Sequence, residues 1–130
     1  MEARNVVIKD AKTAKWYICG PITGFDMEGR RKAFERAEQL VKEMSGDVEI
    51  FNPMRNGLPD DAAYSDHMMC DLEHLVECDA VMVMKGWQNS RGCLIELKFA
   101  RLLNLAIFGE SFAVDGELDK YIRTHPLKKY

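Results

Sequence analysis

Residues 80–103 read AVMVMKGWQNSRGCLIELKFARLL. The first five residues form a continuous apolar run, as in a strand that is covered on both faces of a parallel sheet. Residues 86–89 contain Gly and Asn and predict a loop. From residue 90 onward, apolar residues recur at helical spacing and predict a helix over 90–103. A buried strand, a short loop and a helix in this order are typical of a doubly wound α/β sheet.

The same alternation continues on both sides of this stretch. Apolar runs predict further strands at 16–19, 48–51 and 105–108, and helical spacing predicts helices at 26–44 and 65–77. Right-handed crossovers then place helices on both faces of a parallel sheet. We therefore expect an α/β, flavodoxin-like or Rossmann-like doubly wound fold with four to five strands.

The two ends of the chain carry weaker patterns. Residues 1–15 read as an N-terminal arm, in which the apolar patch at 6–8 predicts an edge strand or a strand that pairs with a partner subunit. Residues 110–130 read as a C-terminal tail with one short helix at 117–123, closed by Pro126. With no repeat or linker, the 130 residues are expected to form a single domain.

Composition excludes several classes of protein. The hydrophobic fraction of 47% is normal for a globular domain, and the net charge of −3 argues against binding to duplex nucleic acid. The sequence has no apolar run of about eighteen residues that would span a membrane, and its N-terminus lacks the apolar core of a signal peptide. These features predict a cytoplasmic protein with no membrane partner.

The cysteines and histidines do not form a recognisable metal motif. Cys19, Cys70, Cys78 and Cys93 contain no CxxC pair and lie in apolar stretches, so we expect reduced thiols in a reducing compartment. The three histidines have no zinc-binding spacing to a cysteine or acidic cluster. No metal and no cofactor are expected.

Three loops are predicted to meet at the carboxyl ends of the strands, where open parallel sheets bind ligands. Residues 20–24 read GPITG, and the two glycines and the Thr23 hydroxyl permit close approach of backbone N–H groups to a ligand oxygen. This loop is neither a GxGxxG fingerprint nor a P-loop, and a tight turn that needs glycine is an equally good interpretation. Residues 52–54 and 86–90 reach the same edge.

Two carboxylates stand at unusual places in their predicted helices. Glu96 has Cys93, Ala100 and Leu103 as its helical neighbours, and a carboxylate in an apolar stripe needs a partner or a function. Asp71 borders the apolar face of the helix at 65–77. The alternative interpretations are a surface glutamate and an ordinary aspartate at a helix margin.

The start of the helix at 90–103 is a candidate anion site. Ser90 can cap the free backbone donors, and a helix N-terminus with Gly92 also suits a phosphate. Trp87 and Tyr17 can stack on a base, although packing in the core or at a subunit contact is as consistent with the sequence. Trp87 and Phe112 are also candidates for a subunit interface.

Three motifs together resemble the nucleoside 2-deoxyribosyltransferase superfamily. They read YICGPITG at 17–24, DLxxLxxCD at 71–79 and SxGxxxEL at 90–97. The resemblance extends from residue 16 to about residue 108 and is greatest to a small bacterial and phage branch with a GPITG-like first loop. Pro21 departs from the residue that many members carry after the first-loop glycine.

The resemblance implies roles for individual residues. It implies that Glu96 is the nucleophile at the sugar's anomeric carbon and that Asp71 contacts the sugar or assists the departing base. It places in the pocket the first-loop residues Tyr17, Gly20, Pro21, Ile22 and Thr23. Ser90 stands six residues before Glu96, as in the branch that hydrolyses deoxynucleoside 5'-monophosphates. A homodimer or higher homo-oligomer is also implied.

We therefore expect an enzyme that cleaves or transfers the N-glycosidic bond of a 2'-deoxynucleoside 5'-monophosphate or a related nucleotide. The alternative is a non-catalytic nucleotide-binding or sensing module on the same fold. A flavodoxin-like electron carrier and a phospho-receiver are less consistent with the sequence. A receiver needs an acceptor aspartate at the end of a strand, whereas Asp79 precedes one.

Overall fold

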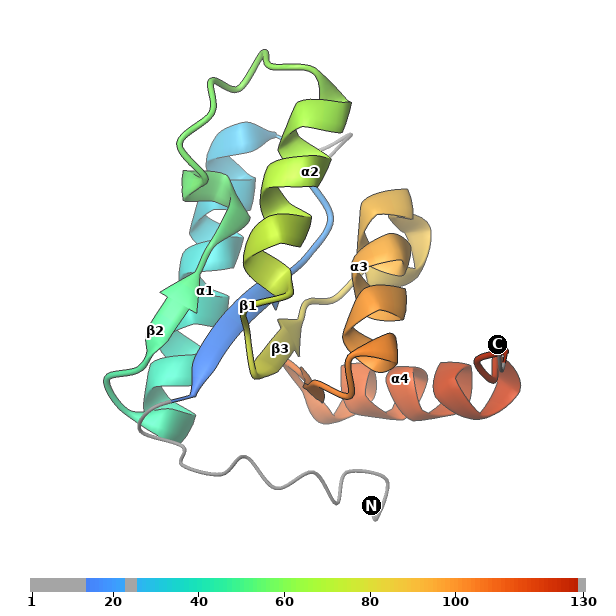
Figure 1. Ribbon diagram of the computed structural model, residues 1–130. Helices are drawn as coiled ribbons and strands as arrows, with labels where there is room; N and C mark the ends of the chain where they lie inside the picture. Colours follow the sequence, from blue (N-terminus) through green and yellow to red (C-terminus); the bar gives the residue numbers. More distant parts are fainter. Residues whose placement is uncertain (1–13, 23–25, 129–130) are drawn as a thin grey trace.

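The computed structural model describes residues 14–22 and 26–128. Its strands are β1 (Lys15–Cys19), β2 (Glu49–Phe51), β3 (Ala80–Val83) and β4 (Ala106–Gly109) (Figure 1). They form one four-stranded sheet in the order β2-β1-β3-β4, and every pairing is parallel. The predicted doubly wound α/β class is confirmed.

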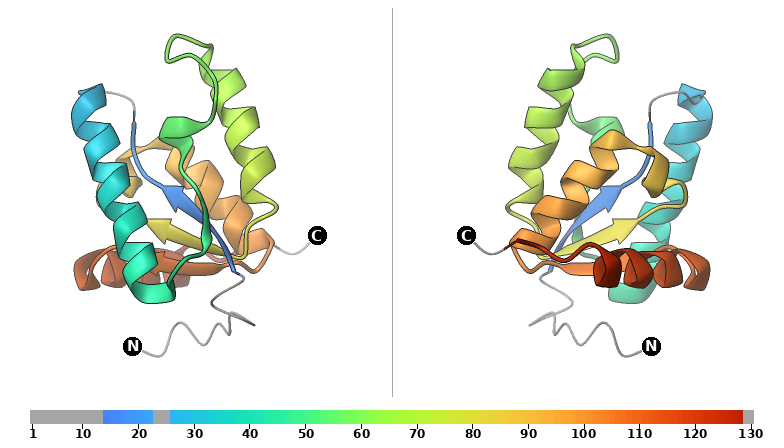
Figure 2. Two further views of the ribbon diagram at one scale, coloured as in Figure 1. Left: turned by 90° about the vertical axis from the view of Figure 1, so that its left-hand side faces the viewer. Right: turned by 90° about the vertical axis from the view of Figure 1, so that its right-hand side faces the viewer.

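Helices cover both faces of the sheet. Helix α1 (Met27–Ser45) lies on one side of the strands, and α2 (Tyr64–Leu75) and α3 (Arg91–Leu102) lie on the other (Figure 2). Because successive strand residues point to opposite faces, β1 contributes to two separate cores. Trp16 and Ile18 pack with α1, whereas Tyr17 and Cys19 point toward α2 and α3.

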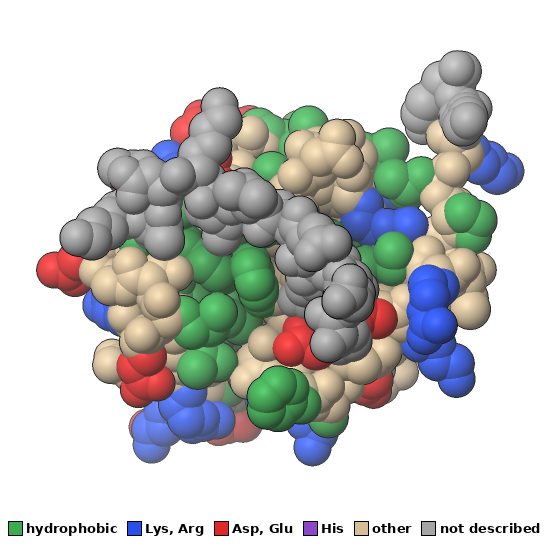
Figure 3. Space-filling model, turned by 90° about the horizontal axis from the view of Figure 1, so that it is seen from below, with side chains coloured by type: hydrophobic (Ala, Val, Ile, Leu, Met, Phe, Trp, Pro, Cys, Tyr) green, Lys and Arg blue, Asp and Glu red, His purple; other side chains and the backbone are tan. Residues whose placement is uncertain are grey.

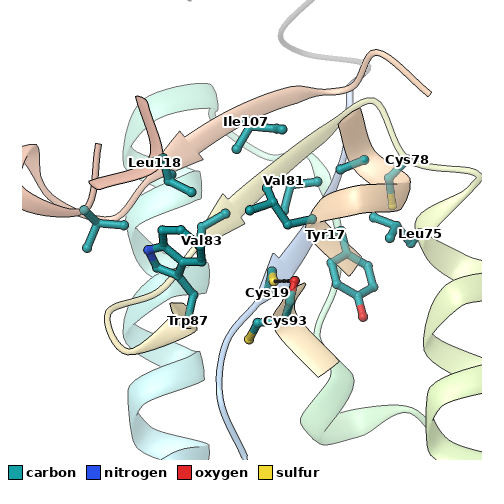
Figure 4. Close-up of a cluster of buried hydrophobic side chains, with 13 residues drawn as sticks. Tyr17, Cys19, Leu75, Cys78, Val81, Val83, Trp87, Cys93, Ile107 and Leu118 are labelled. Carbon is teal, nitrogen blue, oxygen red and sulfur yellow. Dashed lines mark hydrogen bonds between the residues drawn. The ribbon is translucent and has the colours of Figure 1, made fainter. Parts of the chain in front are cut away.

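The core on the α2 and α3 side supports the carboxyl ends of β1 and β3. Tyr17, Val83 and Cys93 are each at most 1% exposed and belong to this cluster, together with Leu75 at the end of α2 (Figure 4). Side chains from four elements thus meet beneath the loops that follow the strands.

Trp87 also belongs to this core, which agrees with the core-packing alternative and not with the expected contact to a ligand. Gly86 has φ +90°, a left-handed conformation that favours glycine, and it leads into a short 3₁₀ helix, η3 (Trp87–Asn89). The Trp87 ring is 1% exposed and meets the edge of Tyr121 with 5.2 Å between ring centroids. It therefore cannot stack on a bound base or serve an exposed interface, whereas Phe112 is 94% exposed.

The C-terminal region contains a longer helix than the sequence pattern predicts. Helix α4 (Phe112–Thr124) begins after Ser111, whose hydroxyl accepts a hydrogen bond from the Val114 N–H, and it packs against β4. Val114 and Leu118 are buried in the larger core. The predicted strand at 6–8 lies outside the described residues. No helix of the described part of the chain is long and apolar enough to cross a membrane.

Gly109, at the end of β4, provides the space for α4. A Cβ atom there would lie 2.7 Å from the Asp115 nitrogen and 2.8 Å from Val114 Cγ1, closer than packed atoms tolerate. We therefore expect Gly109→Ala to lower the free energy of unfolding by about 1–3 kcal/mol, measured by urea denaturation.

Gly116→Ala is the matched control on the same helix. A Cβ atom at Gly116 would meet nothing within 4 Å, and alanine in a helix interior is favoured over glycine. This variant should be more stable than the wild type by about 0.5–1 kcal/mol. Equal effects of the two substitutions would contradict the packing assigned to β4 and α4.

Candidate functional site

A pocket of about 470 Å³ opens where the loops after β1 and β3 meet the N-terminal half of α2 and the start of α3. Both carboxylates singled out from the sequence line it. Glu96 is 7% exposed and Asp71 is 6% exposed. Of the other predicted residues, the pocket is lined by Gly20, Pro21, Ile22, Ser90 and Gly92.

Glu96 is held at the floor of the pocket by the first strand. It projects from the second turn of α3 toward β1, where the Tyr17 hydroxyl donates a hydrogen bond of 2.6 Å to Glu96 Oε2. Tyr17 is 0% exposed, so its ring does not reach a ligand. Tyr17 thus positions the carboxylate from below, which differs from the predicted role in lining the pocket.

The surroundings of Glu96 favour its neutral form. Burial raises the pKa of Glu96 to about 8, the hydrogen bonds from Tyr17 and Cys19 lower it, and the charge of Asp71 raises it. Burial also raises the pKa of Tyr17 well above its usual range, so the phenol remains a donor. A carboxyl with a pKa this far from its usual value, in a cleft, is typical of a functional site.

Tyr17→Phe tests the hydrogen bond directly. Because the phenol stabilises the ionised carboxylate, its removal should raise the pKa of Glu96 above its value of about 8 in the wild type. The measurement is the ¹³C chemical shift of the Glu96 carboxyl against pH in protein labelled at glutamate. An unchanged or lower pKa would contradict this role of Tyr17, and Tyr121→Phe, in the same core but away from Glu96, is the control.

A short network of hydrogen bonds holds the Asp71 carboxylate in place. Asn56 Nδ2 donates to Asp71 Oδ1 over 3.0 Å and also lies 3.0 Å from His67 Nδ1, while Asn56 Oδ1 accepts from the Leu58 N–H. His67 Nε2 is 3.0 Å from the carbonyl oxygen of Pro59, so it is the protonated ring nitrogen and Nδ1 accepts from Asn56. This network fixes the orientation of Asn56 and of Asp71.

The protonation of Asp71 is set by opposing effects. Burial raises the pKa of Asp71, whereas the hydrogen bond from Asn56 lowers it. Both carboxyl groups of the pocket therefore bind protons more readily than exposed carboxyls do. Because the charge of Asp71 raises the pKa of Glu96, the protonation of the two groups is coupled.

The first turn of α3 forms another wall of the pocket. Ser90 caps the helix and accepts a hydrogen bond of 3.2 Å from the Cys93 N–H, which leaves its own O–H free to donate to a ligand. A Cβ atom at Gly92 would lie 3.1 Å from the Tyr64 hydroxyl, so glycine keeps this approach open. The positive end of the helix and its backbone donors thus face the cavity.

A second pocket adjoins the first. It has a volume of about 320 Å³ and shares Ile22, Tyr64 and Asp71 with the first pocket. Apolar side chains such as Met54 and Leu58 and the polar Asn56 and His67 line it. Asp71 therefore lies at the boundary between the two pockets. The first pocket contains Glu96, and the second suits a flat, partly polar group.

Two thiols approach the glutamate. The Sγ atoms of Cys19 and Cys93 and the Glu96 carboxylate lie within 4.8 Å of one another, although sequence spacing gave no sign of such a group. Metal-binding thiols must lose their proton. The neighbouring Cys93 and burial raise the pKa of Cys19 well above its usual range, which favours the neutral thiol, and Cys19 Sγ donates to the Cys93 carbonyl oxygen over 3.9 Å. All four cysteines are free.

Sequence reasoning found most of the pocket but missed several of its residues. Thr23 lies outside the described residues, and Trp87 is in the core. The missed residues include Tyr64 and His67, which precede Asp71 by seven and four positions and so share its helix face. This spacing was sufficient to predict that Tyr64 and His67 lie near Asp71. Asn56, in contrast, comes from a loop whose path no local pattern predicts.

Comparisons with known proteins identify the family and the fold. The model of a family described as a domain of unknown function (DUF4406) matches residues 14–109. No curated protein is similar enough to this chain to be counted as a relative.

Two solved structures have a similar fold. A 2-deoxyribosyltransferase from the psychrotolerant bacterium Bacillus psychrosaccharolyticus is 23% identical, with a TM-score of 0.57 over 74% of this chain and 71% of that one. A conserved protein from Enterococcus faecalis V583 is 18% identical, with a TM-score of 0.54 over 88% and 77%. The expected resemblance to the deoxyribosyltransferase superfamily is confirmed at the level of the fold.

Proposed function

The chain belongs to the DUF4406 family, and from its pocket we propose that it cleaves or transfers the N-glycosidic bond of a 2'-deoxynucleoside 5'-monophosphate or a related nucleotide. The observation that carries the proposal is the buried pair of carboxylates in one pocket, with Glu96 held by Tyr17 and Asp71 held by Asn56. Retaining glycosidases use two carboxylates in the same way, one as nucleophile and one as acid and base.

The two adjoining pockets suggest how the nucleotide lies. The 5'-phosphate occupies the start of α3, where the Ser90 hydroxyl and backbone N–H groups can bind it. The sugar then lies over Glu96, and the base extends past Asp71 and Tyr64 into the second pocket. Holding the sugar against the carboxylate in this way is worth several kcal/mol of the barrier, on the order of 7 kcal/mol in favourable cases.

In the first step, an ionised Glu96 oxygen bonds to C1' while the C1'–N bond breaks. The electron pair of that bond moves to the base nitrogen, and a proton from the Asp71 carboxyl reaches the base. The product of this step is a glycosyl ester on Glu96 and a free base.

In the second step, water or a second base attacks C1' and the ester bond to Glu96 breaks. The Glu96 carboxylate is restored, and the proton of the attacking group passes to the Asp71 carboxylate. The pair therefore begins and ends with one proton. Since burial raises the pKa of Glu96 to about 8 in the ligand-free protein, the first step requires that this proton move from Glu96 to Asp71 when the nucleotide binds.

Stereochemistry tests the covalent intermediate. With methanol as the acceptor, two successive displacements at C1' should give the methyl glycoside with the β configuration of the substrate, identified by ¹H NMR. A product of α configuration would exclude a glycosyl ester on Glu96 and indicate direct attack by the acceptor. Base release that depends on a second base would identify a transferase, and release in water alone a hydrolase.

A further inference from the structure

A groove beside the pocket carries positive charge that no acidic residue balances. It has a volume of about 510 Å³ and lies between the outward side of α3 and the end of α4 with the residues after it. No Asp or Glu among the described residues lines it, and its cations are Arg91, Lys98, Arg101 and Lys128. Lys and Arg side chains lie beside hydrophobic ones near the C-terminal end of the chain (Figure 3). Because the whole chain has a net charge of −3, this local excess of cations points to an anionic ligand.

Two of these cations have no carboxylate partner. Among the described residues, no ion pair involves Arg91 or Lys98, and both side chains are exposed. Arg101, in contrast, donates a hydrogen bond of 2.8 Å to the His125 carbonyl oxygen, and its guanidinium carbon lies 5.9 Å from the centre of the Tyr121 ring. Arg91 and Lys98 are therefore the cations of the groove that a ligand can reach without breaking an existing contact.

The groove adjoins the pocket that contains Glu96. Arg91 lines both spaces and is the first residue of α3, directly after Ser90. In the binding mode proposed above, the 5'-phosphate of the nucleotide lies at this helix start. A group that continues from the 5'-phosphate toward the outward side of α3 therefore passes Arg91 and enters the groove.

The spacing of the free cations suits a short chain of phosphates. Arg91 and Lys98 are seven residues apart and lie on the same side of α3, about 10 Å apart along the helix axis. Side chains on a helix lean toward its N-terminus, which brings the Lys98 ammonium closer to Arg91. A phosphate that follows the first can then bind Arg91, and the next can bind Lys98, through charge-assisted hydrogen bonds.

The lining of the groove suits phosphates better than the bases of a nucleic acid. Proteins that bind single strands combine a basic groove with aromatic side chains on which bases stack. The tyrosine of this groove, Tyr121, is already stacked on His125 at 4.2 Å and meets the edge of Trp87 at 5.2 Å, so its ring is not free for a base. The groove thus offers charge without a free stacking surface.

We propose that the groove binds the β- and γ-phosphates of a nucleoside 5'-triphosphate whose sugar and base occupy the two adjoining pockets. The inference rests on the proposed function for the position of the first phosphate, and it extends the ligand class from monophosphates to triphosphates. A triphosphate carries more negative charge than a monophosphate and meets Arg91 and Lys98 as well as the start of α3. It therefore binds more tightly than the monophosphate of the same base.

Binding to Glu96→Gln protein tests this inference without turnover, because the amide cannot form the glycosyl ester. The probes are the 5'-mono- and 5'-triphosphates of the four common 2'-deoxynucleosides, titrated by calorimetry into the full chain at low salt with EDTA. For the base that binds best, the triphosphate should have a dissociation constant about tenfold lower than that of the monophosphate.

Charge reversal at Lys98 locates the additional phosphates. In the Glu96→Gln background, Lys98→Glu should raise the dissociation constant of the triphosphate about tenfold and that of the monophosphate by less than about twofold. Lys42→Glu, at an exposed position of α1, is the matched control and should change neither constant. Far-UV circular dichroism and thermal melts of each variant separate loss of binding from loss of the fold.

Equal dissociation constants for mono- and triphosphates would overturn the inference, as would triphosphate binding that Lys98→Glu does not weaken. A single-stranded oligonucleotide that binds more tightly than every triphosphate, in a Lys98-dependent manner, would also overturn it and assign the groove to a nucleic acid. Lys98-dependent binding of triphosphate by a wild-type protein that releases no base from any nucleotide would contradict the proposed reaction and still support this inference.

Discussion

Glu96→Gln is expected to lower base release from the best nucleotide substrate by about 10⁴-fold or more, because the amide cannot form the glycosyl ester. The substitution keeps the shape of the side chain, and its amide oxygen can still accept the hydrogen bond from Tyr17. The fold and the binding of nucleotide, followed by thermal shift, should therefore persist. The measurement is chromatography of free base under single-turnover conditions.

Glu35→Gln on the exposed side of α1 is the control for this exchange and should retain wild-type turnover. A Glu96→Gln protein that releases base within about tenfold of the wild-type rate would show that Glu96 is not the nucleophile. Loss of nucleotide binding together with turnover would assign Glu96 to ligand contact instead.

The second large effect of Glu96→Gln is an increase in the free energy of unfolding, in contrast to its loss of activity. The pKa of Glu96 is raised from 4.5 to about 8 in the folded protein, so the folded state binds this proton more tightly than the unfolded state does. The resulting stabilisation is complete below pH 4.5 and is lost as the pH rises to about 8. Glutamine does not titrate, so Glu96→Gln keeps its stability over this range.

Urea denaturation at several pH values measures this difference. Each pKa unit corresponds to about 1.4 kcal/mol, so Glu96→Gln should gain a few kcal/mol over the wild type between pH 4.5 and pH 8. Glu35→Gln should follow the wild type at every pH. If the free energies of unfolding of Glu96→Gln and of the wild type changed with pH in parallel, Glu96 would not be buried as described. A variant that is inactive but more stable at pH 8 would show that the buried Glu96 lowers the stability of the wild type while it is required for activity.

The strands and the first three helices were predictable because burial leaves a strong periodic pattern. The apolar run of β3 and the stripe that contains Glu96 on α3 each follow from one face meeting a core. Glu96 and Asp71 were found because a carboxylate interrupts that pattern.

Features that depend on tertiary contacts were not predictable. Trp87 looked available for a ligand, but the left-handed Gly86 turns it into the core. The N-terminal half of α4 was missed because Gly116 weakens the local helical signal, whereas packing of Val114 and Leu118 against the core stabilises the helix. The Asn56 contact to Asp71 joins a loop to α2 across the pocket, and no local spacing encodes it.

The most direct test of the proposed activity is to incubate the wild-type protein with nucleosides and 5'-monophosphates, with and without an acceptor base, and to chromatograph the mixtures for free base. The buried pair of Glu96 and Asp71 predicts base release, with a preference for 5'-monophosphates that bind at the start of α3. Nucleotides that stabilise the protein against heat without any release of base would contradict the proposed chemistry and identify a binding or sensing module.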